Sequence, residues 1–187
     1  MVSAEVMPGG NGRMRPGVLA RFAGAFYLLA VAAAVTEEFL IPGRLGRAGF
    51  AMPVACYATV MFLLYSLLRP LNRTLPLLAV VSGLAGLALE PLRWHPGGVN
   101  VAMVLHGVYC LQMGFLLART RVSPILAGAA MMAAGVVWLG YISISFAQAI
   151  APWNTALGLI GESLPMLWLL VMGASGTQRS EQAEVVQ

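Results

Sequence analysis

Residues 99–118 read VNVAMVLHGVYCLQMGFLLA and contain no Asp, Glu, Lys or Arg. A transmembrane α-helix needs about 20 consecutive, predominantly apolar residues to cross the hydrocarbon core of a bilayer. This stretch has that length, and it ends directly before Arg119, with Arg121 close behind. It therefore predicts a helix that spans a membrane.

Five more apolar stretches surround this one, three before it and two after it. Of the 187 residues, 59% are hydrophobic and 10% are charged, whereas a soluble domain has about 25% charged residues. We therefore predict an all-α polytopic transmembrane bundle of about six helices at residues 17–173, with disordered cytoplasmic tails at residues 1–16 and 174–187. The expected helices cover residues 18–40, 50–68, 75–92, 99–118, 124–146 and 153–171.

Arginine is distributed unevenly over the ends of the six expected helices. Cytoplasmic loops of membrane proteins carry an excess of basic residues. In a six-helix topology Arg44, Arg47 and Arg93 lie on one side of the membrane, and eight arginines lie on the other side. This predicts that both termini are cytoplasmic. The net charge of +4 then needs no nucleic-acid partner, because the arginines sit at helix ends and form no patch. The eight are Arg13, Arg15, Arg21, Arg69, Arg73, Arg119, Arg121 and Arg179.

Three segments resemble a known family. They are RFAGAFYLL at residues 21–29, RTRVSPILAG at residues 119–128 and ESLPMLWLLVMG at residues 162–173. Together they resemble a domain-of-unknown-function family of small bacterial six-helix integral membrane proteins. The loop at residues 41–49 is shorter than is usual in that family. The resemblance implies the fold and a multi-pass location in a bacterial plasma (inner) membrane, but it implies no activity.

Ionisable side chains inside the expected helices point to function, because a charge at the centre of a bilayer costs about 2.5–3.5 kcal/mol on insertion scales. With a helical rise of about 1.5 Å per residue, all of them fall in the outer half of the membrane. They come from four different helices, so we predict one polar cavity that opens toward the outer face. The residues are Glu37, Glu38, Glu90, His106 and Glu162.

These residues differ in how well a purely structural role would explain them. Glu38 shares a helix face with Gly24, a mark of close packing, so we choose it as a site residue over its neighbour. Glu90 is three residues before Arg93 and could pair with it at the helix end. A single His106 within a bundle could be a hydrogen-bonded core residue. Glu162 has no cationic residue within a turn, so it is the hardest to explain as structure.

Acid–base chemistry is the function that such residues favour. A protonated carboxylic acid facing aromatic side chains can protonate an alkene and stabilise the resulting cation, as in small membrane terpenoid cyclases. In this hypothesis Glu162 or Glu38 is the acid, and Glu90 or His106 takes up the final proton. The substrate is a hydrophobic, prenylated small molecule that reaches the site from the lipid bilayer.

No cofactor or metal is predicted. A carboxylate–histidine metal site is chemically conceivable, but no spacing motif announces one. Cys56 and Cys110 lie inside apolar stretches without C-x-x-C spacing, so we expect both to be small buried side chains.

Two other functions are compatible with the same residues. A proton-coupled or small-solute transporter also needs intramembrane carboxylates and imidazoles. The chain has no repeat between its halves, and its polar residues gather on one side, so a homo-oligomer would have to supply the other half. A non-catalytic accessory protein would use the same glutamates only for structural pairing.

Overall fold

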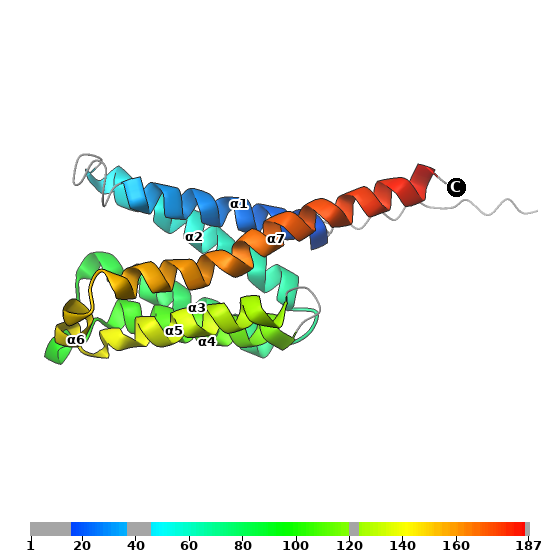
Figure 1. The fold of residues 1–187 in the computed structure, drawn as a ribbon. Helices are drawn as coiled ribbons and strands as arrows, with labels where there is room; N and C mark the ends of the chain where they lie inside the picture. The colour runs from blue at the N-terminus through cyan, green and yellow to red at the C-terminus, as the bar shows by residue number, and fades with distance from the viewer. Residues whose placement is uncertain (1–15, 37–45, 120–123, 186–187) are drawn as a thin grey trace, which may run out of the picture.

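The computed structural model describes residues 16–36, 46–119 and 124–185. These residues form helices and no strand, which confirms the predicted all-α class. The long helices run along one bundle axis (Figure 1). The α-helices are α1 Pro16–Val35, α2 Gly46–Leu68, α3 Thr74–Leu89, α4 Val101–Arg119, α5 Ile125–Leu139, α6 Ile144–Ala149 and α7 Trp153–Val185.

Six segments of the described chain are long and apolar enough to cross a membrane, as predicted for a multi-pass protein. They belong to α1, α2, α3, α4, α5 and α7, and most of their bounds lie within a few residues of the expected ones, although the first ends at Ala33 where residue 40 was expected. Their bounds are Pro16–Ala33, Ala51–Leu68, Thr74–Leu92, Val101–Arg119, Ile125–Ile142 and Trp153–Val171.

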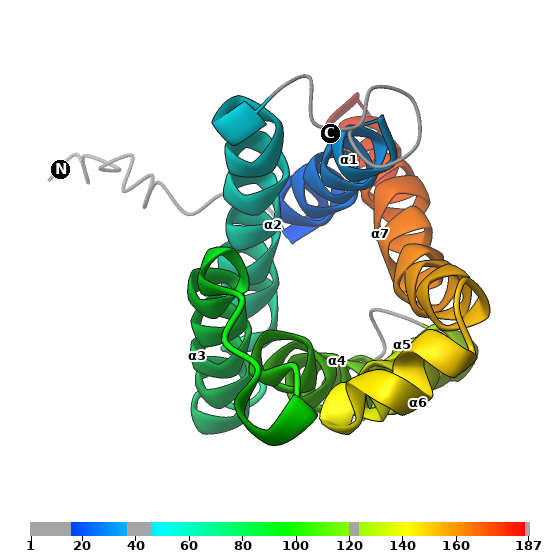
Figure 2. The ribbon, with the colours of Figure 1, turned by 90° about the vertical axis from the view of Figure 1, so that its left-hand side faces the viewer.

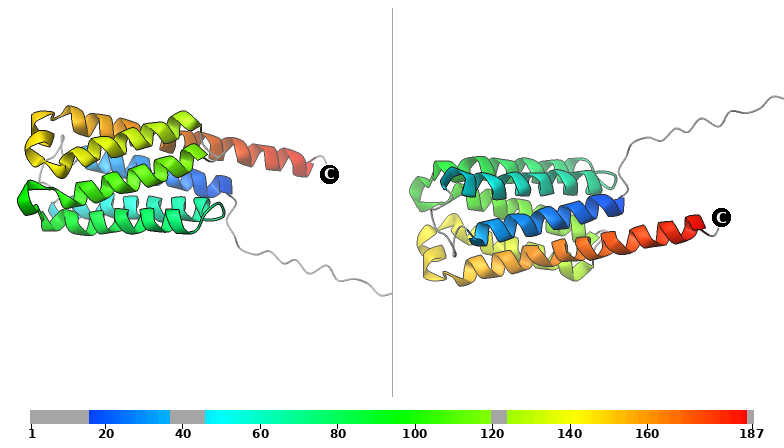
Figure 3. Two further views of the ribbon diagram at one scale, coloured as in Figure 1. Left: turned by 90° about the horizontal axis from the view of Figure 1, so that it is seen from below. Right: turned by 90° about the horizontal axis from the view of Figure 1, so that it is seen from above.

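Helices α5 and α7 also differ in length from the expectation. The helix expected at residues 124–146 ends at Leu139, and a short 3₁₀ turn, Gly140–Ile142, follows it. Ser143 then begins α6, because its side chain accepts a hydrogen bond from the backbone N–H of Phe146. At the other end of the chain, α7 continues to Val185 and projects beyond the bundle (Figure 3), where a disordered tail was expected. Alanine, glutamate and glutamine are frequent there, and they favour helix over coil.

The helices form a ring when the bundle is seen along its axis (Figure 2). Helix α1 packs between α2 and α7, α4 packs between α3 and α5, and α5 packs on α7. The order around the ring is therefore α1, α2, α3, α4, α5 and α7. A ring of this kind lets one central side chain meet residues from several helices.

Close contacts between the backbones of neighbouring helices hold the helices that carry the site in place. A Cβ atom added at Gly107 in α4 would lie 2.9 Å from the carbonyl oxygen of Gly135 in α5, and the converse distance is also 2.9 Å. Likewise, a Cβ atom at Gly24 in α1 would lie 2.7 Å from the carbonyl oxygen of Met166 in α7. Helices in lipid associate through such contacts between small residues. These contacts hold α4 and α1 close to the helices on which Trp138 and Glu162 lie.

Candidate functional site

Glu162 lies in the middle of the membrane-spanning part of α7, and only 2% of it is exposed. Within the described part of the chain, Glu162 and Asn154 are the two buried polar residues. A carboxylate at this depth is costly unless other groups of the protein compensate its charge. The structure supplies that compensation from four other helices.

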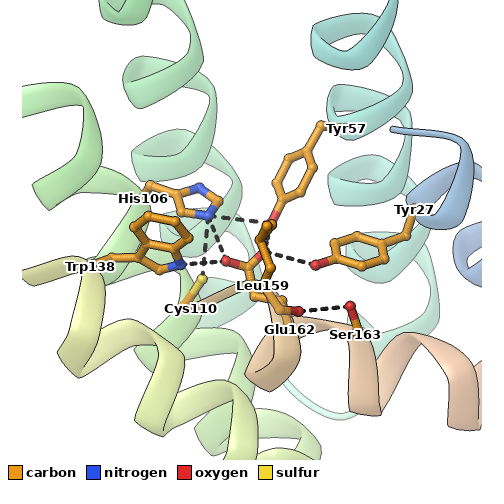
Figure 4. A network of polar contacts seen from close by, with 8 residues as sticks. All are labelled: Tyr27, Tyr57, His106, Cys110, Trp138, Leu159, Glu162 and Ser163. Atoms are coloured by element: carbon orange, nitrogen blue, oxygen red, sulfur yellow. Dashed lines mark hydrogen bonds and ion pairs between the residues drawn. The ribbon is translucent and has the colours of Figure 1, made fainter. Parts of the chain in front are cut away.

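Each carboxylate oxygen of Glu162 faces two polar partners (Figure 4). Oε1 accepts a hydrogen bond from the indole N–H of Trp138 at 2.5 Å and lies 3.0 Å from Nε2 of His106. Oε2 accepts hydrogen bonds from the hydroxyl of Tyr57 and, at 3.4 Å, from that of Tyr27. Both oxygens of the carboxylate therefore have partners in the protein. We call Glu162 and its four partners, Tyr27, Tyr57, His106 and Trp138, the Glu162 network.

His106 makes two further contacts, one within the network and one outside it. Its Nε2 atom lies 3.5 Å from the Tyr57 hydroxyl and 3.7 Å from Sγ of Cys110. His106 and Cys110 are four residues apart in α4, so they lie one turn apart on the same helix face. The His106 side chain is 17% exposed, compared with 2% for Glu162. The imidazole is therefore more accessible than the carboxylate behind it.

Aromatic rings surround the imidazole. The ring centroids of Tyr57, Tyr109 and Trp138 lie 5.3, 5.8 and 5.7 Å from that of His106. The Tyr27 ring lies 5.8 Å beyond Tyr57. Such a surrounding is poor in water and low in dielectric constant, so electrostatic interactions within it are strong.

The structure brings together two of the four residues predicted as a site, His106 and Glu162. Glu90 lies in the 3₁₀ turn Glu90–Leu92 after α3, half-buried, and makes no hydrogen bond with the described members of the network. No ion pair joins it to Arg93 in the described residues either. Glu38, the fourth predicted residue, lies outside the described residues, as does Glu37.

Other members of the site were not predicted. Cys110 is fully buried, as expected, but its sulfur contacts His106. In the sequence, only the spacing of four residues between Cys110 and His106 pointed to this contact. Tyr27, Tyr57 and Trp138 looked like ordinary packing residues, because an aromatic residue in an apolar helix carries no mark of its hydrogen-bond partner.

No family model, curated protein or solved structure matches this chain. The resemblance to a domain-of-unknown-function family therefore stays a prediction, and the function must be argued from the site alone.

Proposed function

We propose that this chain is an integral membrane enzyme that transfers a proton to or from a lipid-soluble substrate, in the manner of an isomerase. The observation that carries the proposal is the position of the Tyr57 hydroxyl, which contacts both Oε2 of Glu162 and Nε2 of His106. A hydroxyl that lies between a carboxylate and an imidazole can give its proton to a substrate. The neighbouring carboxyl group or imidazole can then return a proton to the hydroxyl.

The roles of the groups follow from their surroundings. Tyr27, Tyr57 and Trp138 donate hydrogen bonds to Glu162, and Nε2 of His106 lies within hydrogen-bond distance of it. Such partners stabilise a carboxylate in its charged form. Glu162 is therefore suited to be a base or a counter-charge. Protonation of an alkene by Glu162 itself, as in a terpenoid cyclase, fits this surrounding less well. We assign the proton-transferring role to Tyr57, with Glu162 and His106 as its partners.

Accessibility also favours Tyr57 and His106 as the groups that meet the substrate. Both side chains are partly exposed, whereas Glu162 is 2% exposed. A hydrophobic substrate dissolved in the bilayer, such as a prenylated compound, would meet the hydroxyl and the imidazole first. Glu162 would act through them.

Transport across the membrane is the weaker alternative, because the described core offers no polar path on one side of the site. A proton relay needs a chain of polar groups. Beyond Cys110 toward Arg119, the buried side chains of the described core are apolar, and Gln112 is an isolated, half-buried amide. The buried residues there include Leu64, Leu68, Met113, Leu117 and Leu169.

Proton exchange with a substrate can be measured directly. Membranes that contain the protein are incubated in D₂O with isoprenoid alcohols or prenylated quinones, and deuterium incorporation and isomer formation are followed by mass spectrometry. Tyr57→Phe should slow the exchange by about 10²- to 10⁴-fold, the usual contribution of a general acid or base. Tyr65→Phe is the matched control on the same helix and should exchange like the wild type.

Two results would contradict the proposal. One is exchange in wild-type membranes that does not exceed that of membranes without the protein, for every compound in both classes. The other is exchange that persists unchanged in Tyr57→Phe and in Glu162→Gln.

A further inference from the structure

Three side-chain atoms of different chemical type converge where the Glu162 network meets Cys110. They are Nε2 of His106, Sγ of Cys110 and an oxygen of Glu162, and all lie within 4.8 Å of one another. Imidazole nitrogen, thiolate sulfur and carboxylate oxygen are the three ligand types that proteins use for zinc. We propose that these residues form a binding site for a divalent transition metal ion, Zn²⁺.

A cysteine-nucleophile triad would use the same residue types, but the geometry excludes it. In such a triad the thiol and the carboxylate contact different nitrogens of the imidazole ring. Here Cys110 and Glu162 both face Nε2, at 3.7 and 3.0 Å. Convergence on a single point is the arrangement that a metal ion requires.

The two distances from the His106 nitrogen are close to those of tetrahedral coordination, and the Cys110 sulfur and the Glu162 oxygen lie within 4.8 Å of each other. Zinc bonds to nitrogen and oxygen are about 2.0–2.2 Å long, and bonds to sulfur are about 2.3 Å. At tetrahedral angles these lengths place nitrogen about 3.4 Å from oxygen and about 3.6 Å from sulfur. The corresponding distances between His106 and its two neighbours are 3.0 and 3.7 Å. Shifts of a few tenths of an ångström would therefore bring the nitrogen into bonding geometry with both partners.

The charges also balance, which matters in a bilayer. A dication with the Cys110 thiolate, the Glu162 carboxylate and a neutral His106 gives a site without net charge. On binding, the thiol proton is released to solvent together with any proton on the imidazole, and the metal–sulfur and metal–nitrogen bonds take their place. A neutral site avoids the penalty for burying an uncompensated charge.

Neighbouring donors would hold the ligands in place. Trp138 donates to Oε1 and Tyr57 to Oε2, so the Glu162 carboxylate can bind a metal through one oxygen while both donors stay bonded. Such outer partners orient metal ligands and contribute to affinity. Three protein ligands leave a fourth coordination position open, as in catalytic zinc sites. A substrate oxygen bound there would lie near Tyr57, and this catalytic part of the inference rests on the proposed function.

Metal binding is tested on the full-length protein, purified in detergent, reduced and stripped of metal with a chelator. Zn²⁺ affinity is measured by competition with a chromophoric chelator, and Co²⁺ is added to detect the near-ultraviolet charge-transfer absorption of a thiolate–cobalt bond. We expect one ion per chain and a thiolate band. Trp138→Phe should keep the band and weaken Zn²⁺ binding about 10- to 100-fold.

The two cysteines supply a matched pair of variants. Cys110→Ala should lose the cobalt band and weaken Zn²⁺ binding more than Trp138→Phe does, whereas Cys56→Ala, in the buried part of α2, should change neither. If Cys110→Ala does not elute as a monodisperse protein, His106→Asn replaces it, with the same expected loss of Zn²⁺ affinity. Absence of stoichiometric binding in the wild type, or an unchanged band in Cys110→Ala, would overturn the metal site.

The outcomes separate the two proposals. Substrate exchange that is equally fast in chelator-stripped and Zn²⁺-loaded protein would remove the metal from the reaction and leave the proposed function standing. Stoichiometric Zn²⁺ binding without substrate exchange would establish the metal site and contradict the proposed enzyme.

Discussion

His106 in α4 and Glu162 in α7 are 56 positions apart in the sequence, yet Nε2 of the first lies 3.0 Å from Oε1 of the second. The pair is enclosed by aromatic side chains within the part of the chain that spans the membrane. Removing one member of a buried hydrogen-bond network leaves the other polar groups without a partner. The stability of the fold should therefore depend on Glu162.

Replacement of Glu162 by alanine should destabilise the protein by about 3–5 kcal/mol, because His106, Trp138 and Tyr57 all lose their partner and each unpaired buried polar group costs about 1–3 kcal/mol. Glu162→Gln keeps an acceptor oxygen and should cost less, about 1–3 kcal/mol. The measurement is reversible unfolding in detergent and denaturant, followed by circular dichroism. Equal stability of Glu162→Ala and the wild type would show that the network does not support the fold.

Removing the hydroxyl should change the stability of the fold differently for two tyrosines near Glu162. Tyr57→Phe removes a donor to the carboxylate and should cost about 1–3 kcal/mol. The hydroxyl of Tyr109 is buried and has no partner among the described residues, so Tyr109→Phe should be neutral or stabilising. The same unfolding experiment compares them, and a larger loss in Tyr109→Phe than in Tyr57→Phe would reverse the assignment.

A glycine beside the indole should be sensitive to a methyl group. A Cβ atom at Gly158 would lie 2.5 Å from Cε2 of Trp138, whereas one at Gly140 would meet its nearest neighbour, the Phe146 ring, at 3.5 Å. Gly158→Ala should therefore overpack the site, destabilise the fold by about 1–3 kcal/mol and change the tryptophan fluorescence. Gly140→Ala is the control and should leave both properties close to those of the wild type.

The orientation predicted from the arginines can be tested with reporter fusions. Green fluorescent protein fused to the C-terminus should fluoresce, because it folds in the cytoplasm. Alkaline phosphatase fused after His95 should be active, because the predicted orientation places that turn outside. Arg69 and Arg73 flank the turn at the opposite end of the described bundle. A phosphatase fusion after Asn72 should therefore be inactive. The reverse pattern of activities would place both termini outside.

The sequence allowed the fold to be predicted because length and lack of charge identify a membrane-spanning helix without any tertiary information. It also singled out Glu162 and His106, because ionisable groups stand out in apolar segments. The break after Leu139 was missed, since no charged residue marks it and the cap at Ser143 lies within the expected helix. Glu38 stays a prediction, because it lies outside the described residues.

The partners of Glu162 could not be predicted for a physical reason. A helix that is apolar on every side has no polar face, so its rotation about its own axis cannot be read from its sequence. That rotation is set by contacts such as those of Gly107 with α5 and of Gly24 with α7. Helix packing, rather than any polar pattern in the sequence, turns Tyr27, Tyr57 and Trp138 toward the same carboxylate.

The location of Glu162 in α7 has a consequence for biogenesis. The helices that carry its partners are made before it during synthesis, and their hydroxyl, imidazole and indole groups enter the bilayer without the acceptor that they share. Insertion of the seventh helix between α1 and α5 brings that acceptor and closes the ring in a single event. Translation that stops before this helix would leave an open assembly with exposed donors in lipid, a form that membrane quality-control proteases could distinguish from the finished protein.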